Sequence, residues 1–337
     1  MTTIGRVADT PAIPAASNDL RWLFDRYYGT ERSSGPETSS HWTACSKQFE
    51  VRLDANGCPV PVRGHGFGEL RFPRPWQAAL DWVTIGAYLA GLPDRARIIP
   101  LLRPGPRLAR RMGLAFTYDA FRQVCTLALI AGHLSETQHR GGLRVLLIGD
   151  GYGFLGALVK EVYPQAAVVF VDLGQVLLFQ AHYVQRAHPG CRHRVARAGR
   201  AEPLADSDFV YCPADRLEAL PRLSCDVAVN IASMQEMTTE AVTSYLRFLR
   251  EHLATEGLFY CCNRERKRLT GGEVQEFARY PWSERDVHLV DGVCPWHRYY
   301  LGFRRASNGP RIFGWRVPFV NCFDGPHRHR LTRLARG

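Results

Sequence analysis

Four glycines that follow a short apolar run near the middle of the 337-residue chain form its most informative pattern. The run Arg144–Ile148 has the character of a strand buried on both faces, and the segment Ala157–Tyr163 after the glycines can form an amphipathic helix. Glycines in such a turn let the backbone approach a ligand where a side chain would collide. The helix N-terminus adds unpaired N–H groups and the positive end of a dipole. The pattern therefore predicts a nucleotide-binding βα unit.

The spacing of these glycines distinguishes two classes of ligand. Gly151-x-Gly153-x-x-Gly156 formally satisfies the dinucleotide fingerprint, which keeps an NAD(P)-dependent oxidoreductase as an alternative. In that fingerprint the first glycine directly follows the strand, and here that residue is Gly149. The register Gly149-x-Gly151-x-Gly153 therefore fits the predicted strand better.

This register resembles motif I of the class I S-adenosylmethionine-dependent methyltransferases, which implies S-adenosyl-L-methionine as the cofactor. The resemblance implies that Asp172, 19 residues after Gly153 and at the end of the second predicted strand, binds both ribose hydroxyls. A carboxylate suits this role because it accepts two hydrogen bonds at once. Asp215, after the third strand, matches an acid near the adenine amine. The implied cofactor-binding set is Gly149, Asp150, Gly151, Gly153, Asp172, Leu173, Asp215, Arg216 and Asn230.

The chain departs from the family pattern at Leu147. The family usually has an acid at this position, two residues before the first glycine, and this chain has no carboxylate there for the cofactor's amino group. Asp150, inside the turn, is the expected substitute. The departure also keeps open a catalytically inactive binding protein with the methyltransferase fold.

The segment Asn230–Met237 follows the fourth predicted strand, where this superfamily places residues that face the methyl group. This segment is similar to the corresponding segment of the bacterial sugar O-methyltransferase family. The resemblance of the chain to that family covers roughly residues 40–305. The similarity extends to Ser40-His41-Trp42, Tyr118–Ile130, Tyr245–Leu249 and Asn263-Arg264. It implies methyl transfer to a hydroxyl of a sugar, aminocyclitol or related small molecule.

Transfer of a methyl group to a hydroxyl is an in-line displacement that depends on alignment and is helped by a general base. The candidate bases are Glu236 and His297, and the candidate acceptor-binding residues are Gln235, Asn263 and Arg264. Two other interpretations stay open: Glu236 as an acid stabilising the helix that begins near Thr238, and His297 as a structural residue. We expect no metal, because no clustered carboxylates follow the fourth and fifth strands.

Strands and helices alternate from residue 143 onwards, which predicts an α/β fold. We expect a doubly wound, Rossmann-like, mostly parallel sheet of about seven strands, with a mainly helical N-terminal accessory region. The expected divisions are a disordered leader (1–18), a mostly helical region with a small hairpin (19–140), the cofactor-binding domain (141–320) and a basic tail (321–337). The C-terminal strands are expected near 287–289, 299–303 and 311–317.

Composition adds weaker constraints. The net charge of +11 comes from arginine and keeps an RNA or protein methyltransferase as an alternative, although no basic and aromatic interleaving typical of RNA binding occurs. No apolar run reaches the ~18 residues that cross a bilayer. The ten cysteines contain no CxxC pair and no Cys/His ligand spacing, so we expect reduced thiols, no structural zinc and a cytoplasmic location. The expected partner is a small-molecule hydroxyl acceptor rather than nucleic acid or a membrane, and self-association into a homo-oligomer stays open.

Overall fold

The computed structural model describes residues 18–28, 39–64, 75–92, 94–140, 142–197, 206–301, 311–323 and 325–336. The expected leader lies outside these residues, except for Asn18, which begins the first helix. Among the described helices, none has the length and apolar character needed to cross a bilayer.

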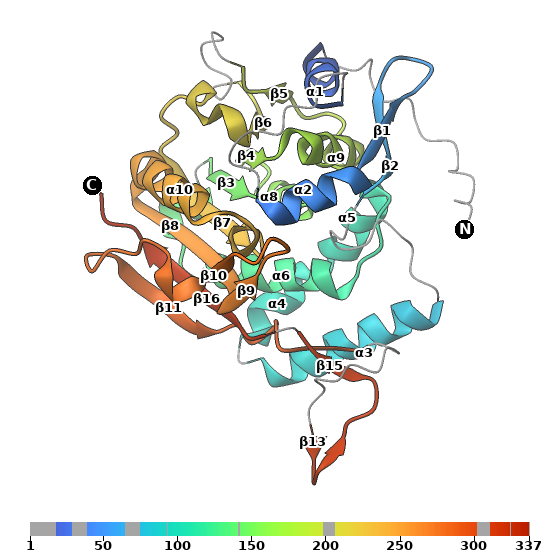
Figure 1. Ribbon diagram of the computed structural model, residues 1–337, viewed down its shortest axis with the longest axis vertical. Helices are drawn as coiled ribbons and strands as arrows, with labels where there is room; N and C mark the ends of the chain where they lie inside the picture. The colour runs from blue at the N-terminus through green and yellow to red at the C-terminus, as the bar shows by residue number, and fades with distance from the viewer. Residues whose placement is uncertain are drawn as a thin grey trace.

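The centre of the protein is an eight-stranded sheet in the order β11-β16-β8-β7-β3-β4-β6-β5 (Figure 1). All neighbouring strands from β8 to β5 are parallel, whereas β16 is antiparallel to both β8 and β11. The predicted doubly wound, mostly parallel α/β sheet is therefore confirmed. The strands are β3 (Arg144–Ile148), β4 (Ala167–Asp172), β5 (His193–Val195), β6 (Phe209–Pro213), β7 (Cys225–Ile231), β8 (Leu253–Arg264), β11 (Val287–Val293) and β16 (His327–Arg333).

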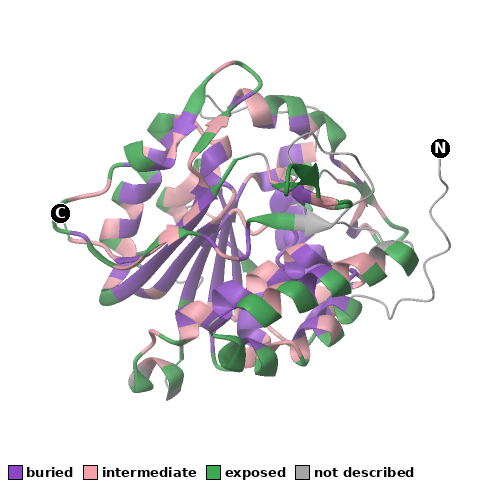
Figure 2. Ribbon diagram, turned by 90° about the horizontal axis from the view of Figure 1, so that it is seen from below, coloured by how far each residue is buried: buried purple, intermediate pink, exposed green. Residues whose placement is uncertain are grey.

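Successive side chains of a strand point to opposite faces of the sheet, and in these strands both sets are apolar. Helices therefore cover both faces. Leu147 and Phe170 belong to the core shared with helices α5, α6, α8 and α9, and Leu146 and Ile148 to the core shared with α10. Figure 2 shows the strands buried between these layers. The helices are α5 (Pro104–Met112), α6 (Tyr118–Ala131), α8 (Phe154–Val162), α9 (Gly174–Ala187) and α10 (Thr239–His252).

The N-terminal region contains the expected helices and hairpin. Its hairpin turn is closed by Asp54, whose Oδ1 accepts hydrogen bonds from the backbone N–H groups of Asn56 and Cys58, both at 2.8 Å. The elements are α1 (Asn18–Tyr28), α2 (Ser40–Cys45), η1 (Ser46–Gln48), β1 (Glu50–Leu53), β2 (Pro59–Arg63), α3 (Pro75–Gly91), α4 (Arg95–Leu101) and α7 (Glu136–Arg140).

The structure differs from the sequence prediction near the C-terminus. The segments expected as strands near 299–303 and 311–317 form small separate sheets, β12 with β15 and β13 with β14. Residues 327–333, expected in a basic tail, form β16 inside the central sheet. The pattern was masked by charge: His327, His329 and Leu331 are buried, while Arg328 and Arg330 alternate with them and pair with Asp291 on β11 at 3.0 and 2.6 Å. The remaining elements are η2 (Ala214–Ala219), η3 (Met234–Glu236), β9 (Arg266–Arg268), β10 (Val274–Glu276), η4 (Phe277–Arg279), β12 (Tyr299–Leu301), β13 (Arg311–Ile312), β14 (Trp315–Arg316) and β15 (Val320–Cys322).

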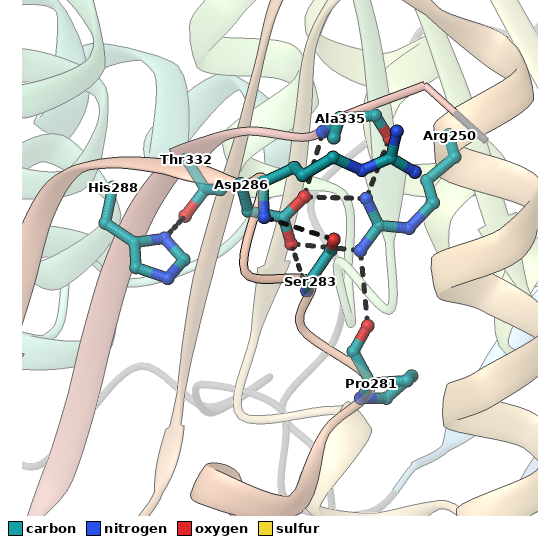
Figure 3. A network of polar contacts seen from close by, with 8 residues as sticks. Arg250, Pro281, Ser283, Asp286, His288, Thr332 and Ala335 are labelled. Atoms are coloured by element: carbon teal, nitrogen blue, oxygen red, sulfur yellow. Dashed lines mark hydrogen bonds and ion pairs between the residues drawn. The ribbon is translucent and has the colours of Figure 1, made fainter.

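A buried ion pair attaches the end of the chain to α10 (Figure 3). Arg250 donates two hydrogen bonds to the Asp286 carboxylate, at 2.7 and 2.9 Å, and a third to the carbonyl oxygen of Ala335 at 2.8 Å. The same carboxylate accepts from the backbone N–H groups of Ser283 and Ala335. Although burial raises the pKa of Asp286, these hydrogen bonds hold it below its ordinary value.

Replacing Asp286 with asparagine is expected to lower the free energy of unfolding by about 3 kcal/mol, because the half-buried Arg250 loses its buried counter-charge. Since the folded pKa of Asp286 is depressed, its stabilisation is present above the unfolded pKa and is lost as the pH falls through the folded value. Asp286→Asn should lack that acid-dependent loss in urea titrations. Asp206→Asn, at a carboxylate 88% exposed, is the control and should match wild type. Equal urea midpoints for Asp286→Asn and wild type would contradict the prediction.

Candidate functional site

A cavity of about 260 Å³ opens at the carboxyl ends of the parallel strands, beside β3. Strand β3 lies between β4 and β7, so the strand order reverses there, and open α/β sheets bind ligands at such switch points. The sheet contributes Gly149–Tyr152, Phe154, Asp172, Ile231–Ser233 and Glu236 to the lining. The N-terminal region contributes His41, Trp42, Leu114, Ala115, Asp119, Ala120, Arg122 and Gln123.

The glycine turn after β3 has the backbone conformation that its sequence indicated. Gly149, Gly151 and Gly153 all have positive φ angles, of 75°, 54° and 81°. A Cβ at Gly149 would also lie 2.1 Å from the Ser233 Oγ, so the turn packs directly against the segment after β7. Gly153 is the N-cap of α8 and does not line the cavity.

Gly156 and Leu147 serve the packing of α8 on the sheet. A Cβ at Gly156 would lie 2.3 Å from the Phe170 ring and 3.0 Å from Leu147 Cδ1. Helix packing therefore requires this glycine, whatever ligand the turn binds. Leu147 is buried on that face and does not line the cavity, so it offers no group to a ligand there.

Asp172 reaches the cavity from the end of β4, where the sequence placed it. Its Oδ1 accepts a hydrogen bond from the Leu173 N–H at 2.8 Å, and its Oδ2 accepts one from Gln180 Nε2 at 2.6 Å. Burial raises its pKa to about 7, against the opposing effect of these two hydrogen bonds. Each carboxylate oxygen has two lone pairs, so both oxygens can still accept a hydrogen bond from a ligand.

Asp150 also lines the cavity, but its carboxylate is engaged by the turn itself. It accepts hydrogen bonds from the N–H groups of Leu155 at 3.3 Å and Gly156 at 2.9 Å, in the first turn of α8. Burial raises its pKa to about 8, while these hydrogen bonds act in the opposite direction. Asp150 thus satisfies helix N–H groups that a ligand would otherwise meet.

Glu236 faces the cavity between two cationic or protonatable side chains. It forms an ion pair with Lys267 of β9, and its Oε2 lies 3.4 Å from His41 Nε2. Although burial raises its pKa, the hydrogen bond to His41 and the charge of Lys267 hold it below the ordinary value. Glu236 is therefore a weak proton acceptor. The N-cap of α10 is instead Thr238, whose Oγ1 accepts a hydrogen bond from the Ala241 N–H at 3.2 Å.

His41 is the main site residue to which sequence reasoning assigned no role. Its helix α2 is capped by Ser39, which accepts from the Trp42 N–H and donates to the Glu236 carbonyl oxygen at 2.5 Å. These contacts place His41 over the segment after β7. The only sequence signal was the similarity of Ser40-His41-Trp42 to the sugar O-methyltransferases.

Helix α6 contributes three polar side chains to the cavity that sequence reasoning did not identify. Asp119 and Arg122 form an ion pair, and both line the cavity together with Gln123. The buried Oε1 of Gln123 accepts no hydrogen bond from any residue that the structure describes. The sequence predicted this helix, but its helical periodicity did not show which polar residues face the site.

Three predicted site residues form a buried amide network behind the cavity. Asn230 donates to the Ile148 carbonyl oxygen and accepts from the Met234 N–H and from Asn263 Nδ2. Asn263 also accepts from the Gln235 N–H, and Gln235 accepts from the Arg264 N–H. Asn230, Gln235 and Asn263 do not line the cavity, so they position the segment after β7.

The other predicted residues lie outside the cavity. Asp215 accepts a hydrogen bond from the Tyr27 hydroxyl at 2.7 Å, and Arg216 lies over the Trp22 ring, so both contact α1. Leu173, Arg216 and Arg264 are half-buried. His297 is fully buried, and its pKa lies well below the ordinary value because burial disfavours the charged ring. The structure therefore does not bring His297 to this site as a base.

The expectation that the chain has no Cys/His ligand spacing was wrong. Cys294 and His297, with two residues between them in one turn, meet Cys262 of β8, and their donor atoms lie within 4.8 Å of one another. The ten cysteines are free in the structure. This group lies outside the cavity.

Comparison with known proteins finds similarity in fold but no family. No family model and no curated protein matches the sequence. Similar solved structures include the PH0226 protein of Pyrococcus horikoshii (10% identity, TM-score 0.38, 64% of this chain and 91% of that one). Others are TrmN of Thermus thermophilus (13%, 0.37, 63% and 48%) and a coclaurine N-methyltransferase bound to N-methylheliamine and S-adenosylhomocysteine (14%, 0.35, 52% and 50%). The chain spans about half the length of the latter two. Similarities at these identities and TM-scores leave the function to be argued from the site's own residues.

Proposed function

We propose that the protein is an S-adenosylmethionine-dependent methyltransferase that methylates a hydroxyl of a sugar-like small molecule. The observation that carries the proposal is the meeting of residues 149–152 of the glycine turn and Asp172 in one cavity at the switch point of the sheet. A glycine turn open to close backbone approach and a buried strand-end carboxylate suit a ligand with a ribose.

The cavity offers a separate residue for each part of this cofactor. Asp172 binds the ribose hydroxyls, and the glycine turn faces the methionine part. Asp119 accepts hydrogen bonds from its ammonium group and so replaces the acid absent at Leu147, with Gln123 beside it in the lining. Arg122 is the available cation for its carboxylate.

The sheet order supports this proposal over a dinucleotide enzyme. Dinucleotide-binding sheets have the parallel order 3-2-1-4-5-6, with a second βαβαβ half on the far side of the switch point. Here only two parallel strands, β7 and β8, lie on that side of β3, and the position of a third is taken by the antiparallel β16. Gly156 of the formal fingerprint is accounted for by its contact with Phe170.

His41 is the proposed general base. A hydrogen on Nε2 that faces Glu236 leaves the lone pair on Nδ1, which can take the proton of the acceptor hydroxyl. The carboxylate of Glu236, already ionised by its pairing with Lys267, fixes this tautomer and stabilises the imidazolium that forms. The polar side chains of His41 and Glu236, which are not assigned to the cofactor, favour a hydroxylated acceptor over an apolar one.

Isothermal titration calorimetry with S-adenosylhomocysteine and NAD⁺ tests the cofactor assignment. We expect binding of S-adenosylhomocysteine and no heat of binding with NAD⁺. The reverse result would favour the oxidoreductase. Methyl transfer to RNA, with a steep dependence on salt, would retain the cofactor but overturn the small-molecule acceptor.

A further inference from the structure

Two cysteines and a histidine, Cys262, Cys294 and His297, form what we name the Cys–His cluster. Cys262 lies in β8, and Cys294 directly follows β11. A turn closed by a hydrogen bond from the His297 N–H to the Cys294 carbonyl oxygen, at 3.3 Å, points both side chains to one place. All three residues are almost completely buried, with exposures of 0%, 0% and 2%.

The donor atoms of the cluster are spaced as metal ligands are. His297 Nδ1 lies 3.2 Å from the Cys294 Sγ and 3.7 Å from the Cys262 Sγ, and all three donors lie within 4.8 Å of one another. In a tetrahedral zinc site the Zn–S and Zn–N bonds of roughly 2.3 and 2.0 Å place neighbouring ligand atoms about 3.6 Å apart. A single ion can therefore reach all three donors without movement of the backbone.

A second observation comes from the residue stacked on the cluster. The ring centroid of His327 lies 4.7 Å from that of His297. His327 is 3% exposed, and its Nδ1 forms no hydrogen bond within the part of the chain that the structure describes. The Nε2 of His297 is likewise buried and without such a bond. Buried polar atoms are normally paired, so the described residues do not fully satisfy the polar groups around the cluster.

We propose that the Cys–His cluster binds one zinc ion through the two Sγ atoms and His297 Nδ1. Binding forms two Zn–S bonds and one Zn–N bond, and the two thiol protons leave to solvent. No oxidation state changes. Two thiolates neutralise the charge of the ion, and a neutral centre is compatible with the nearby, partly buried Arg122, whose charge is paired with Asp119.

The ion would stabilise the wall behind the cavity rather than take part in the reaction. The Cys262 carbonyl oxygen accepts the Ala232 N–H at 2.7 Å, and the Cys294 N–H donates to the His327 carbonyl oxygen at 2.7 Å. The cluster therefore joins β8, the turn after β11 and β16 at the segment that carries Glu236.

Metal analysis of the full-length protein tests this inference. The protein is purified with a tag that contains no histidine, dialysed against zinc-free buffer and analysed by inductively coupled plasma mass spectrometry. We expect about one zinc per chain. Co²⁺ added to the metal-free protein should give a sulfur-to-cobalt charge-transfer absorption, with release of two protons per ion bound.

Cys294→Ser and His297→Ala should lose the metal and the cobalt spectrum, whereas Cys225→Ser, at a buried cysteine at the start of β7, should retain both. If these variants do not fold, the wild-type measurements still decide. Wild-type protein that contains no zinc and gives no cobalt–thiolate absorption overturns the proposal. A Cys262–Cys294 disulfide in the non-reduced intact mass does so as well.

Discussion

Asp172→Asn is expected to weaken binding of S-adenosylhomocysteine by about a hundredfold, because asparagine carries no charge and can accept from only one ribose hydroxyl. The substitution preserves the shape of the side chain. Gln180 can turn its amide so that Oε1, which is buried without a described partner, accepts from the amide group that the substitution introduces. Calorimetry at pH 8 measures the effect. Asp25→Asn, at an exposed carboxylate paired with Arg21, is the matched control and should bind as wild type does.

The same substitution is expected to stabilise the ligand-free protein above pH 7. The folded pKa of Asp172, about 7, lies above its unfolded value, so its contribution to stability is complete below the unfolded pKa and is lost as the pH rises through about 7. Asparagine has no ionised form to bury. Thermal melts at pH 8 should therefore give a Tm a few degrees higher for Asp172→Asn.

Affinity of the wild-type protein should also depend on pH. The ribose hydroxyls need the ionised carboxylate, so binding requires loss of a proton when the pH is below about 7. The dissociation constant should rise by up to about tenfold per pH unit on acidification, and this slope should vanish in Asp172→Asn. An unchanged affinity in that variant would show that Asp172 does not bind the cofactor. It would not affect the description of the fold.

His41→Ala is expected to lower kcat by about 10²–10⁴-fold with little change in cofactor affinity, because it removes the proposed proton acceptor. Glu236→Gln should produce a smaller loss, since the imidazole remains but its anionic partner is gone. His139→Ala, at a histidine of α7 outside the cavity, is the control and should retain full turnover.

The acidity of the acceptor separates a base from a merely structural histidine. A phenolic hydroxyl ionises far more readily than a sugar hydroxyl, so it depends less on a base. The loss caused by His41→Ala should therefore shrink with a phenolic acceptor, if the enzyme accepts one. An equal loss with both acceptors, or full turnover of the sugar-like acceptor without His41, would exclude it as the base.

The central fold could be predicted because its signals are local. The apolar run Arg144–Ile148, the glycines after it and the N-cap Thr238 each act over a few residues through backbone sterics and hydrogen bonding. Strand β16 could not be predicted in this way. Two of its four buried residues are histidines, and arginines alternate with them, so the segment reads as an exposed basic one. The charges of Arg328 and Arg330 are paired only when β11 brings Asp291 beside them.

The sequence by itself determined the glycine turn, its register and the carboxylate of Asp172, because strand, turn and strand end follow one another along the chain and meet at the same edge of a parallel sheet. Only the tertiary structure decided which side chains complete the site. His41 of α2 pairs with Glu236, which lies 195 positions later in the chain, and Lys267 of β9 pairs with the same carboxylate. The same holds for Cys262, which meets Cys294 and His297 only because β16 brings the turn after β11 close to β8. Contacts between distant segments depend on how the layers pack, and no local pattern specifies that arrangement.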